Sequence, residues 1–354
     1  MSLGPVRECL RAAGIRTLAL VLGLMGLVSG CRTHVPAVAE SRFEFEQPQM
    51  GLPFRIVLYS TSSDSARTAA DAAWRRIAAL NAILSDYEET SELSLLSKSA
   101  GSGRTVPVGP ELWAVLARAE RVSKVSDGAF DITVGPLVQL WKRARRQREL
   151  PPTNRLAAAR ESVGWRWIEL DAAHHTARLT RPGMRLDPGG IAKGYALDEA
   201  AAVLRAQGIR RFLVSGGGDM VAGDPPPDQP GWKVEVGVFD GPGAPAPRFV
   251  SLKRQALATS GDVFQRAEIG GVRYSHIVDP HTGIGLTDHS LVTMIGPDGM
   301  TVDALSKVVS VLGASKAFPI LREFSGVESL VLRAPGGRIE TTETAGFRRW
   351  AWPR

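Results

Sequence analysis

The amino-acid sequence predicts an α+β fold, in which strands and helices mix without the regular alternation of a doubly wound sheet. Two patterns carry this prediction. Short alternating or β-branched segments recur, such as FRIVLYS (54–60) and SLVTMIG (290–296), whereas longer segments such as 64–84 repeat apolar residues at helical spacing. With 354 residues, of which 44% are apolar and 22% charged, the chain can bury a full hydrophobic core.

The first half is predicted to start with strands and to continue with helices. RFEFE (42–46) and FRIVLYS read as strands, and the next 20 or so residues as a helix. A second helix is expected from Pro110, a residue suited to a first turn, to about Ser126, before Asp127 and Gly128 end it. WRWIELD (165–171) and TARLTR (176–181) flank a His-rich turn and predict a hairpin.

The second half is predicted to be richer in strands. A helix over 191–207 ends at Gly208, and RFLVS (211–215) then reads as a strand. Further strands are expected in KVEVGV, near 249–258, and in GVRYSHIV, SLVTMIG and VESLVLR, with helices at 300–312 and near 315–324. The Pro-rich segments 224–231 and 241–247 read as loops.

The formal net charge of +7 comes from scattered basic residues and one local run, KRARRQR (142–148), which we expect to be an exposed loop. The run has no interleaved aromatic residues and belongs to no nucleic-acid-binding module, so the sequence argues against a nucleic-acid partner. Contact with anionic lipid headgroups or with a phosphorylated ligand stays open.

The N-terminus predicts export and lipidation. Three arginines precede the apolar stretch TLALVLGLMGLVSG (17–30), which is too short to span a bilayer and suits a signal peptide. It ends in LVSGC, which resembles a bacterial lipobox. We therefore expect a signal peptide over 1–30, lipid on Cys31, a tether over 31–41 and one domain over 42–350. A plain signal peptide or an uncleaved anchor is the alternative.

This prediction places the protein on the periplasmic side of a bacterial membrane. Arg32 is not an aspartate retention signal, which slightly favours the outer membrane. Because Cys9 would leave with the signal peptide and Cys31 would carry lipid, the mature protein would have no thiol for a disulfide, a nucleophile or a zinc site.

Two glycine-rich stretches follow predicted strands. In LDPGGIAKGYALDEAAAVL (186–204) glycines precede a helix start, where backbone N–H groups favour an anion, and Lys193 could add charge. A plain strand-to-helix turn is the alternative, since this is neither a Walker A loop nor a GxGxxG fingerprint. VSGGGDM (214–220) ends in a carboxylate. Because the two stretches lie about 25 residues apart, they could share one pocket.

Three further polar residues have two interpretations each. Asp131, in SDGAFDITVGPLVQLW (126–141), either caps a turn or accepts hydrogen bonds from a ligand. His276, in YSHIVDPHTG (274–283), is either a general base or a structurally hydrogen-bonded histidine. Asp303, in GMTVDALSKVVSVLG (299–313), either forms a helix salt bridge with Lys307 or holds a metal ion. The histidines lack metal-ligand spacing such as HxxxH.

Taken together, these segments resemble the ApbE family of bacterial flavin transferases. The resemblance runs from about Met50 to Gly313, in the family's order, through MGLPF, SDYEETSELS, SDGAFDITVGPLVQLW, LDPGGIAKGYALD, VSGGGDM, ATSGD, YSHIVDPHTG and TVDALSKVVSVLG. It implies a single two-lobed domain of the T-fold-like type. Family members of this kind are often periplasmic lipoproteins.

The resemblance also implies an activity. The family binds FAD, cleaves its pyrophosphate with Mg²⁺ and transfers FMN to a Thr or Ser hydroxyl of a target flavoprotein, releasing AMP. The alternative is a lipoprotein of the same fold that binds or hydrolyses FAD without transferring FMN. A non-catalytic periplasmic adaptor is a third possibility, which Asp219, Asp303 and His276 argue against.

The resemblance assigns roles to individual residues. His276 would be the general base that activates the acceptor hydroxyl. The FAD site would be lined by Met50, Tyr87, Ala129, Phe130, Asp131, Gly189, Tyr195 and Ile277. The metal would be held by the Ala192 carbonyl, Asp303 and Ser306.

One residue departs from the family's pattern. Lys307 stands four residues after Asp303, where the family usually has Thr or Ser. An ammonium group cannot ligate a metal, and it could instead take the place of the cation beside the phosphates. The metal stoichiometry is therefore open.

Overall fold

The computed structural model describes residues 39–240, 243–262 and 266–353, and Glu40–Arg354 form one compact unit. The predicted signal peptide, Cys31 and nearly all of the tether lie outside the described residues.

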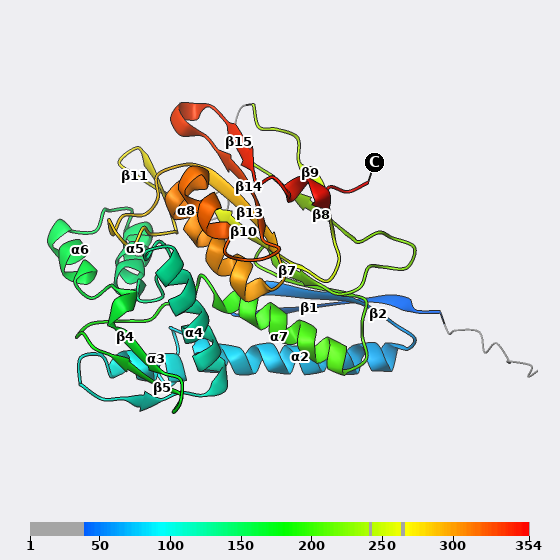
Figure 1. The fold of residues 1–354 in the computed structure, drawn as a ribbon, viewed down its shortest axis with the longest axis horizontal. Coiled ribbons are helices and arrows are strands. Elements are labelled where there is room, and N and C mark those ends of the chain that lie inside the picture. The colour runs from blue at the N-terminus through cyan, green and yellow to red at the C-terminus, as the bar shows by residue number, and fades with distance from the viewer. Residues whose placement is uncertain (1–38, 241–242, 263–265, 354) are drawn as a thin grey trace, which may run out of the picture. The chain divides into compact units, whose positions relative to one another are not determined.

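An eight-stranded antiparallel sheet forms the centre of this unit, and the prediction of an α+β fold is confirmed (Figure 1). Its strand order is β1-β2-β6-β7-β10-β13-β14-β15. The strands are β1 (Ser41–Gln49), β2 (Leu52–Ser60), β6 (Phe212–Gly216), β7 (Asp219–Ala222), β10 (Ala256–Gly261), β13 (Ser290–Gly296), β14 (Glu328–Arg333) and β15 (Glu340–Glu343).

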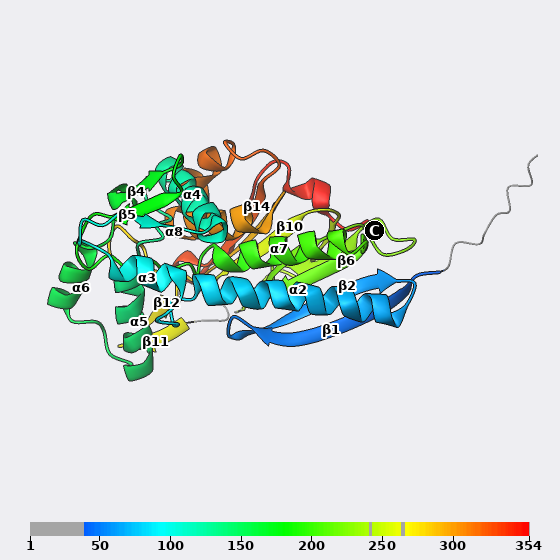
Figure 2. The ribbon, with the colours of Figure 1, turned by 90° about the horizontal axis from the view of Figure 1, so that it is seen from below.

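Helices cover one face of this sheet. The described α-helices are α2 (Ser63–Leu84), α3 (Glu92–Lys98), α4 (Pro110–Val125), α5 (Gly135–Gln147), α6 (Thr153–Arg160), α7 (Ala192–Ala206) and α8 (Gly299–Leu321). Of these, α2, α7 and α8 pack on the sheet, and α2 lies alongside α7 in both views (Figures 1 and 2). α8 is broken at Gly313, which separates the two predicted helical segments.

Alternation along the strands builds a core on each face of the sheet, because successive side chains point to opposite sides. In β2, Phe54, Ile56 and Leu58 join the core beneath the helices, while Val57 faces the other way. That second core is closed by the hairpin β8 (Trp232–Val236) and β9 (Arg248–Leu252), and by the short helix Phe347–Trp350.

Smaller sheets complete the unit. The predicted hairpin at 165–181 is present as β4 (Ile168–Asp171) and β5 (Thr176–Leu179), which pair with β3 (Val106–Pro107). A second hairpin, β11 (Arg266–Ile269) and β12 (Val272–Ser275), packs near α5.

Two expectations of the sequence were wrong. The basic run 142–148 is not a loop, because α5 continues through Gln147. Leu137, Trp141 and Ala144 bury one helical face, and the basic side chains occupy the rest of the surface of α5. The segment near 249–258 is two strands, β9 and β10, separated by a turn in which Arg254 has φ of 52°.

Among the described residues, α8 is the one helix long and apolar enough to cross a membrane by length and composition. Its apolar residues instead pack against β10, β13 and α7, and Val302, Leu305 and Val308 are fully buried. α8 is therefore a core helix, and its polar residues are enclosed with it.

Candidate functional site

The candidate site lies where helices α7 and α8 cross, with their backbones in close contact at Gly194 and Gly299. A Cβ atom on Gly194 would overlap the Gly299 carbonyl oxygen, so only glycine permits this approach. As a result the Gly194 amide donates to Asp303 Oδ2 at 3.1 Å, from one helix to the other.

Asp198, one turn further along α7, secures the same crossing. Its carboxylate accepts from the amides of Gly299 (2.7 Å) and Met300 (2.9 Å), which begin α8. Burial raises the pKa of Asp198 to about 7, although these two hydrogen bonds act in the opposite direction.

A cluster of four charged side chains forms beside this crossing, and we call Lys193, Asp219, Asp303 and Lys307 the charge cluster. Lys193 Nζ lies 2.7 Å from Asp219 Oδ2 and 3.4 Å from both Asp303 oxygens. Lys307 Nζ lies 2.6 Å from Asp303 Oδ1. The two glycine-rich stretches therefore meet in one place, as the sequence suggested.

The charge cluster is enclosed. The Asp303 side chain is fully buried, and those of Lys307 and Lys193 are 15% and 19% exposed. Burial alone would raise the pKa of Asp303, but the two ammonium groups outweigh it and the pKa is lowered. Burial would likewise lower the pKa of Lys193, but Asp219 and Asp303 raise it instead. Asp303 and Lys193 are therefore held in their ionised forms, whereas burial raises the pKa of Asp219, a rise that Lys193 opposes.

The Gly189–Gly190 turn lies against the charge cluster. A Cβ on Gly190 would stand 3.2 Å from Lys307 Cγ and 3.2 Å from Phe130 Cε2, so the glycine leaves room for both side chains. Gly189 is exposed, and its amide donates to Asp187 Oδ1 at 2.8 Å. α7 begins just beyond, without a side-chain cap on its N-terminus.

Asp131 is the turn cap that one interpretation of the sequence described. Its Oδ1 accepts from the Thr133 amide (2.8 Å) and hydroxyl (2.7 Å), and its Oδ2 from the Trp165 amide (2.8 Å). Burial raises its pKa, and the hydrogen bonds oppose the rise. These bonds fix the segment that carries the buried side chains of Ala129 and Phe130.

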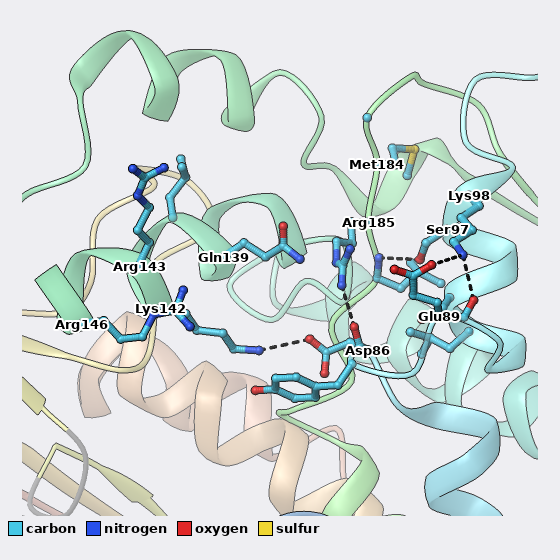
Figure 3. A pocket seen from close by; sticks show the side chains of 16 residues that line it. Asp86, Glu89, Ser97, Lys98, Gln139, Lys142, Arg143, Arg146, Met184 and Arg185 are labelled. Carbon is cyan, nitrogen blue, oxygen red and sulfur yellow. Dashed lines mark hydrogen bonds and ion pairs between the residues drawn. The ribbon is translucent and has the colours of Figure 1, made fainter.

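Tyr87 lies in a separate, strongly basic pocket of about 770 Å³ (Figure 3). Tyr87 is 75% exposed, and Lys142 Nζ stands 4.3 Å from its ring centroid. Lys142 also reaches Asp86 Oδ2 at 3.1 Å, and Arg185 donates to the Asp86 carbonyl at 2.6 Å. The basic side chains that line the pocket are Lys98, Lys142, Arg143, Arg146 and Arg185.

His276 and Ile277 follow β12 in a loop that docks on the Asp127 segment. His276 is half-buried and Ile277 is buried. The docking contact is made by His281, whose Nε2 lies 2.8 Å from the Asp127 carbonyl oxygen. This contact anchors the loop next to the turn that leads into Phe130.

Two further predicted residues occupy other places. Met50 has φ of 51° in the two-residue turn between β1 and β2, half-buried. Leu52, two residues further on, packs so close to Gly217 of the second glycine-rich stretch that a Cβ there would lie 2.7 Å from Leu52 Cδ1. Tyr195 is buried on α7 and lines a pocket of about 350 Å³ with Asp198.

The residues proposed for a metal do not fit a Mg²⁺ site as they are arranged. Both Asp303 oxygens already accept hydrogen bonds, and Ser306 Oγ donates to the Asp303 carbonyl at 2.6 Å. Ala192, a buried first-turn residue of α7, would offer only a backbone carbonyl. Within the parts of the chain that the structure describes, no three His, Cys, Asp or Glu side chains form a group able to hold a metal.

From the sequence, Lys193 was expected only to add charge near an anion and Asp219 only to favour an enzyme, and neither was placed among the FAD or metal residues. Asp219 also accepts from the Thr259 amide at 3.0 Å, which brings in ATSGD (258–262). The available signal was a carboxylate directly after one glycine run and a lysine three residues after the other.

Comparison with known proteins gives consistent matches. The model of the ApbE family matches residues 50–331. The FAD:protein FMN transferase of Haemophilus influenzae is 30% identical over 276 residues, 76% of this chain and 80% of that protein. The protein of the same name from Klebsiella pneumoniae is 26% identical over 344 residues, 95% of each chain.

Solved structures agree. The flavin transferase ApbE from Vibrio cholerae has a TM-score of 0.78 at 26% identity, and the match covers 88% of this chain and 99% of that one. The apo form of the Pseudomonas stutzeri flavinyl transferase ApbE has a TM-score of 0.77 at 27% identity, covering 89% and 98%.

Proposed function

The chain belongs to the ApbE family, and we propose that it is an FAD:protein FMN transferase that attaches FMN to a Thr or Ser hydroxyl of a target flavoprotein. The observation that carries the proposal is the convergence of four separate motifs on the charge cluster, within a fold shared with flavin transferases. Relatives of that name match over most of the chain.

The surroundings of the cluster suit the FAD substrate. α7 begins just after the Gly189–Gly190 turn without a side-chain cap, and the positive end of its helix dipole favours phosphate oxygens there, although the Gly189 amide already donates to Asp187. The basic pocket around Tyr87 has the size of a typical ligand pocket. One of its lining residues, Leu186, lies three residues before Gly189 in the sequence. We therefore expect FAD to extend from the Gly189–Gly190 turn into the pocket around Tyr87, with Phe130 beside it.

The proposed reaction forms one phosphoester bond to the acceptor and breaks one bond of the FAD pyrophosphate. The acceptor hydroxyl oxygen attacks the phosphorus of the FMN half of FAD, its proton passes to His276, and the bond to the AMP phosphate breaks so that AMP leaves. A neutral hydroxyl is a weak nucleophile, so a base contributes about 10²–10⁴-fold. The fixed Lys193 side chain and the N-terminal end of α7 would counter phosphate charge without reorganisation.

The location remains a proposal from the sequence. The lipobox-like LVSGC predicts lipid on Cys31 and a place on the periplasmic side of a membrane, with the outer membrane favoured. An acceptor in the same compartment would then be within reach.

The test is direct labelling. The purified full-length protein is incubated with FAD and a flavoprotein subunit bearing a candidate Thr or Ser, and the acceptor is inspected by in-gel flavin fluorescence. Covalent fluorescence that disappears when the acceptor residue is changed to Ala supports transfer. AMP release without labelling would favour the hydrolase, and an absence of FAD binding would remove the proposal altogether.

A further inference from the structure

We propose that the Lys307 ammonium group takes the place of a divalent cation, so that this chain binds and cleaves FAD without a bound Mg²⁺. The inference rests on the proposed function and concerns the same site. It follows from what surrounds Asp303, from how Lys307 is held, and from the charge balance of the cluster.

Both carboxylate oxygens of Asp303 are already engaged by donors. Oδ1 lies 2.6 Å from Lys307 Nζ, and Oδ2 accepts from the Gly194 amide at 3.1 Å, while Lys193 approaches both oxygens at 3.4 Å. A cation inserted at Oδ1 would have to displace an ammonium group that is already paired there. Two like charges this close repel each other, and the low dielectric constant of an enclosed site strengthens the repulsion.

Ser306 cannot replace the missing ligand. Its hydroxyl donates to the Asp303 carbonyl at 2.6 Å, and its oxygen stands 3.2 Å from Lys307 Nζ. The lysine therefore occupies the space between the two oxygens that a metal would need. Mg²⁺ demands near-octahedral oxygen coordination, which a neighbouring ammonium group prevents.

Lys307 is built into the site and does not reach in from solvent. Its stem packs against Gly190, where an added Cβ would lie 3.2 Å from Lys307 Cγ and 3.2 Å from Phe130 Cε2. The side chain is 15% exposed. Its ammonium group therefore lies near the Gly189–Gly190 turn, where we expect the phosphate oxygens of FAD.

The charge balance supports the same conclusion. Two lysines face two aspartates in the charge cluster, and burial raises the pKa of Asp219, so the cluster carries no surplus negative charge before any ligand binds. A divalent cation would add two positive charges to an enclosed site that has no surplus acid to compensate them.

The experiment measures Mg²⁺ binding itself, by isothermal titration of the full-length protein in detergent without FAD. We expect no saturable binding to the wild-type protein. Lys307→Thr removes the ammonium group and adds an oxygen, and it should bind Mg²⁺ at least about tenfold more tightly. Lys307→Arg keeps the charge and should resemble wild type. Lys307→Met removes the charge without adding an oxygen, and it should bind more weakly than Lys307→Thr.

A second measurement uses the wild-type protein alone, so it does not depend on the folding of any variant. AMP release from FAD should be equal in excess EDTA and in Mg²⁺. A tenfold or greater loss in EDTA, or saturable Mg²⁺ binding to the wild-type protein, would overturn the inference and leave the transferase proposal intact. If FAD does not bind at all, the proposed function fails, and the titration still decides whether Lys307 excludes Mg²⁺.

Discussion

Asp303→Asn is expected to destabilise the fold strongly, because it breaks the balance of the charge cluster. The carboxylate is fully buried and faces two ammonium groups, at 2.6 Å for Lys307 and 3.4 Å for Lys193. Its neutralisation leaves Asp219 alone opposite both. Removal of one partner from a buried ion pair typically costs about 3–5 kcal/mol. We therefore expect the free energy of unfolding in urea, followed by circular dichroism, to fall by about this amount.

A double-mutant cycle separates charge balance from packing. Asp303→Asn combined with Lys307→Met leaves Lys193 opposite Asp219, so the pair should be less destabilised than the sum of the single variants, by about 0.5–3 kcal/mol. Glu89→Gln is the control, since its ion pair with Lys98 is exposed and should change stability little. Additive effects, or a cost of Asp303→Asn no larger than that of the control, would refute the reasoning.

Three further predictions concern other parts of the site. His276→Ala should slow FMN transfer at least about 10²-fold while leaving the Kd for FAD within a few-fold, and equal losses in both would identify a structural histidine. Asp198 has a pKa of about 7 in the folded protein against an ordinary value of 3.8, so the folded state retains a proton that the unfolded state releases. Stability should consequently fall as pH rises from about 4 to about 7, more steeply in wild type than in Asp198→Asn, and parallel pH profiles would contradict this. Gly190→Ala places a Cβ against Lys307 and Phe130, and it should weaken FAD binding and cost about 1–3 kcal/mol of stability; unchanged FAD affinity would separate this turn from the binding site.

The sequence predicted those parts of the site that depend on local spacing. Asp303 and Lys307 are four residues apart on one helix, so their pairing could be foreseen. The second ammonium group could not, because Lys193 reaches Asp303 only where α7 and α8 cross at Gly194. That contact joins residues 110 positions apart and depends on tertiary packing.

In one other segment, the high content of charged residues hid the helical spacing of the apolar ones. The run 142–148 read as a basic loop because charge dominates it, yet Trp141 and Ala144 continue a buried stripe that begins at Leu137. Tyr87 illustrates a different limit. Its surroundings, including Lys142 from a helix more than 50 residues away, follow from the packing of α5 and not from the residues next to it.

The measurement that tests the central claim most directly is the ratio of AMP released to FMN attached to the acceptor protein. Both quantities are measured in one reaction of the full-length protein with FAD, AMP by chromatography and attached FMN by mass spectrometry of the acceptor. A transferase should release one AMP for each FMN that becomes attached. Release of AMP that is independent of the acceptor, with no FMN on the acceptor, would contradict the account.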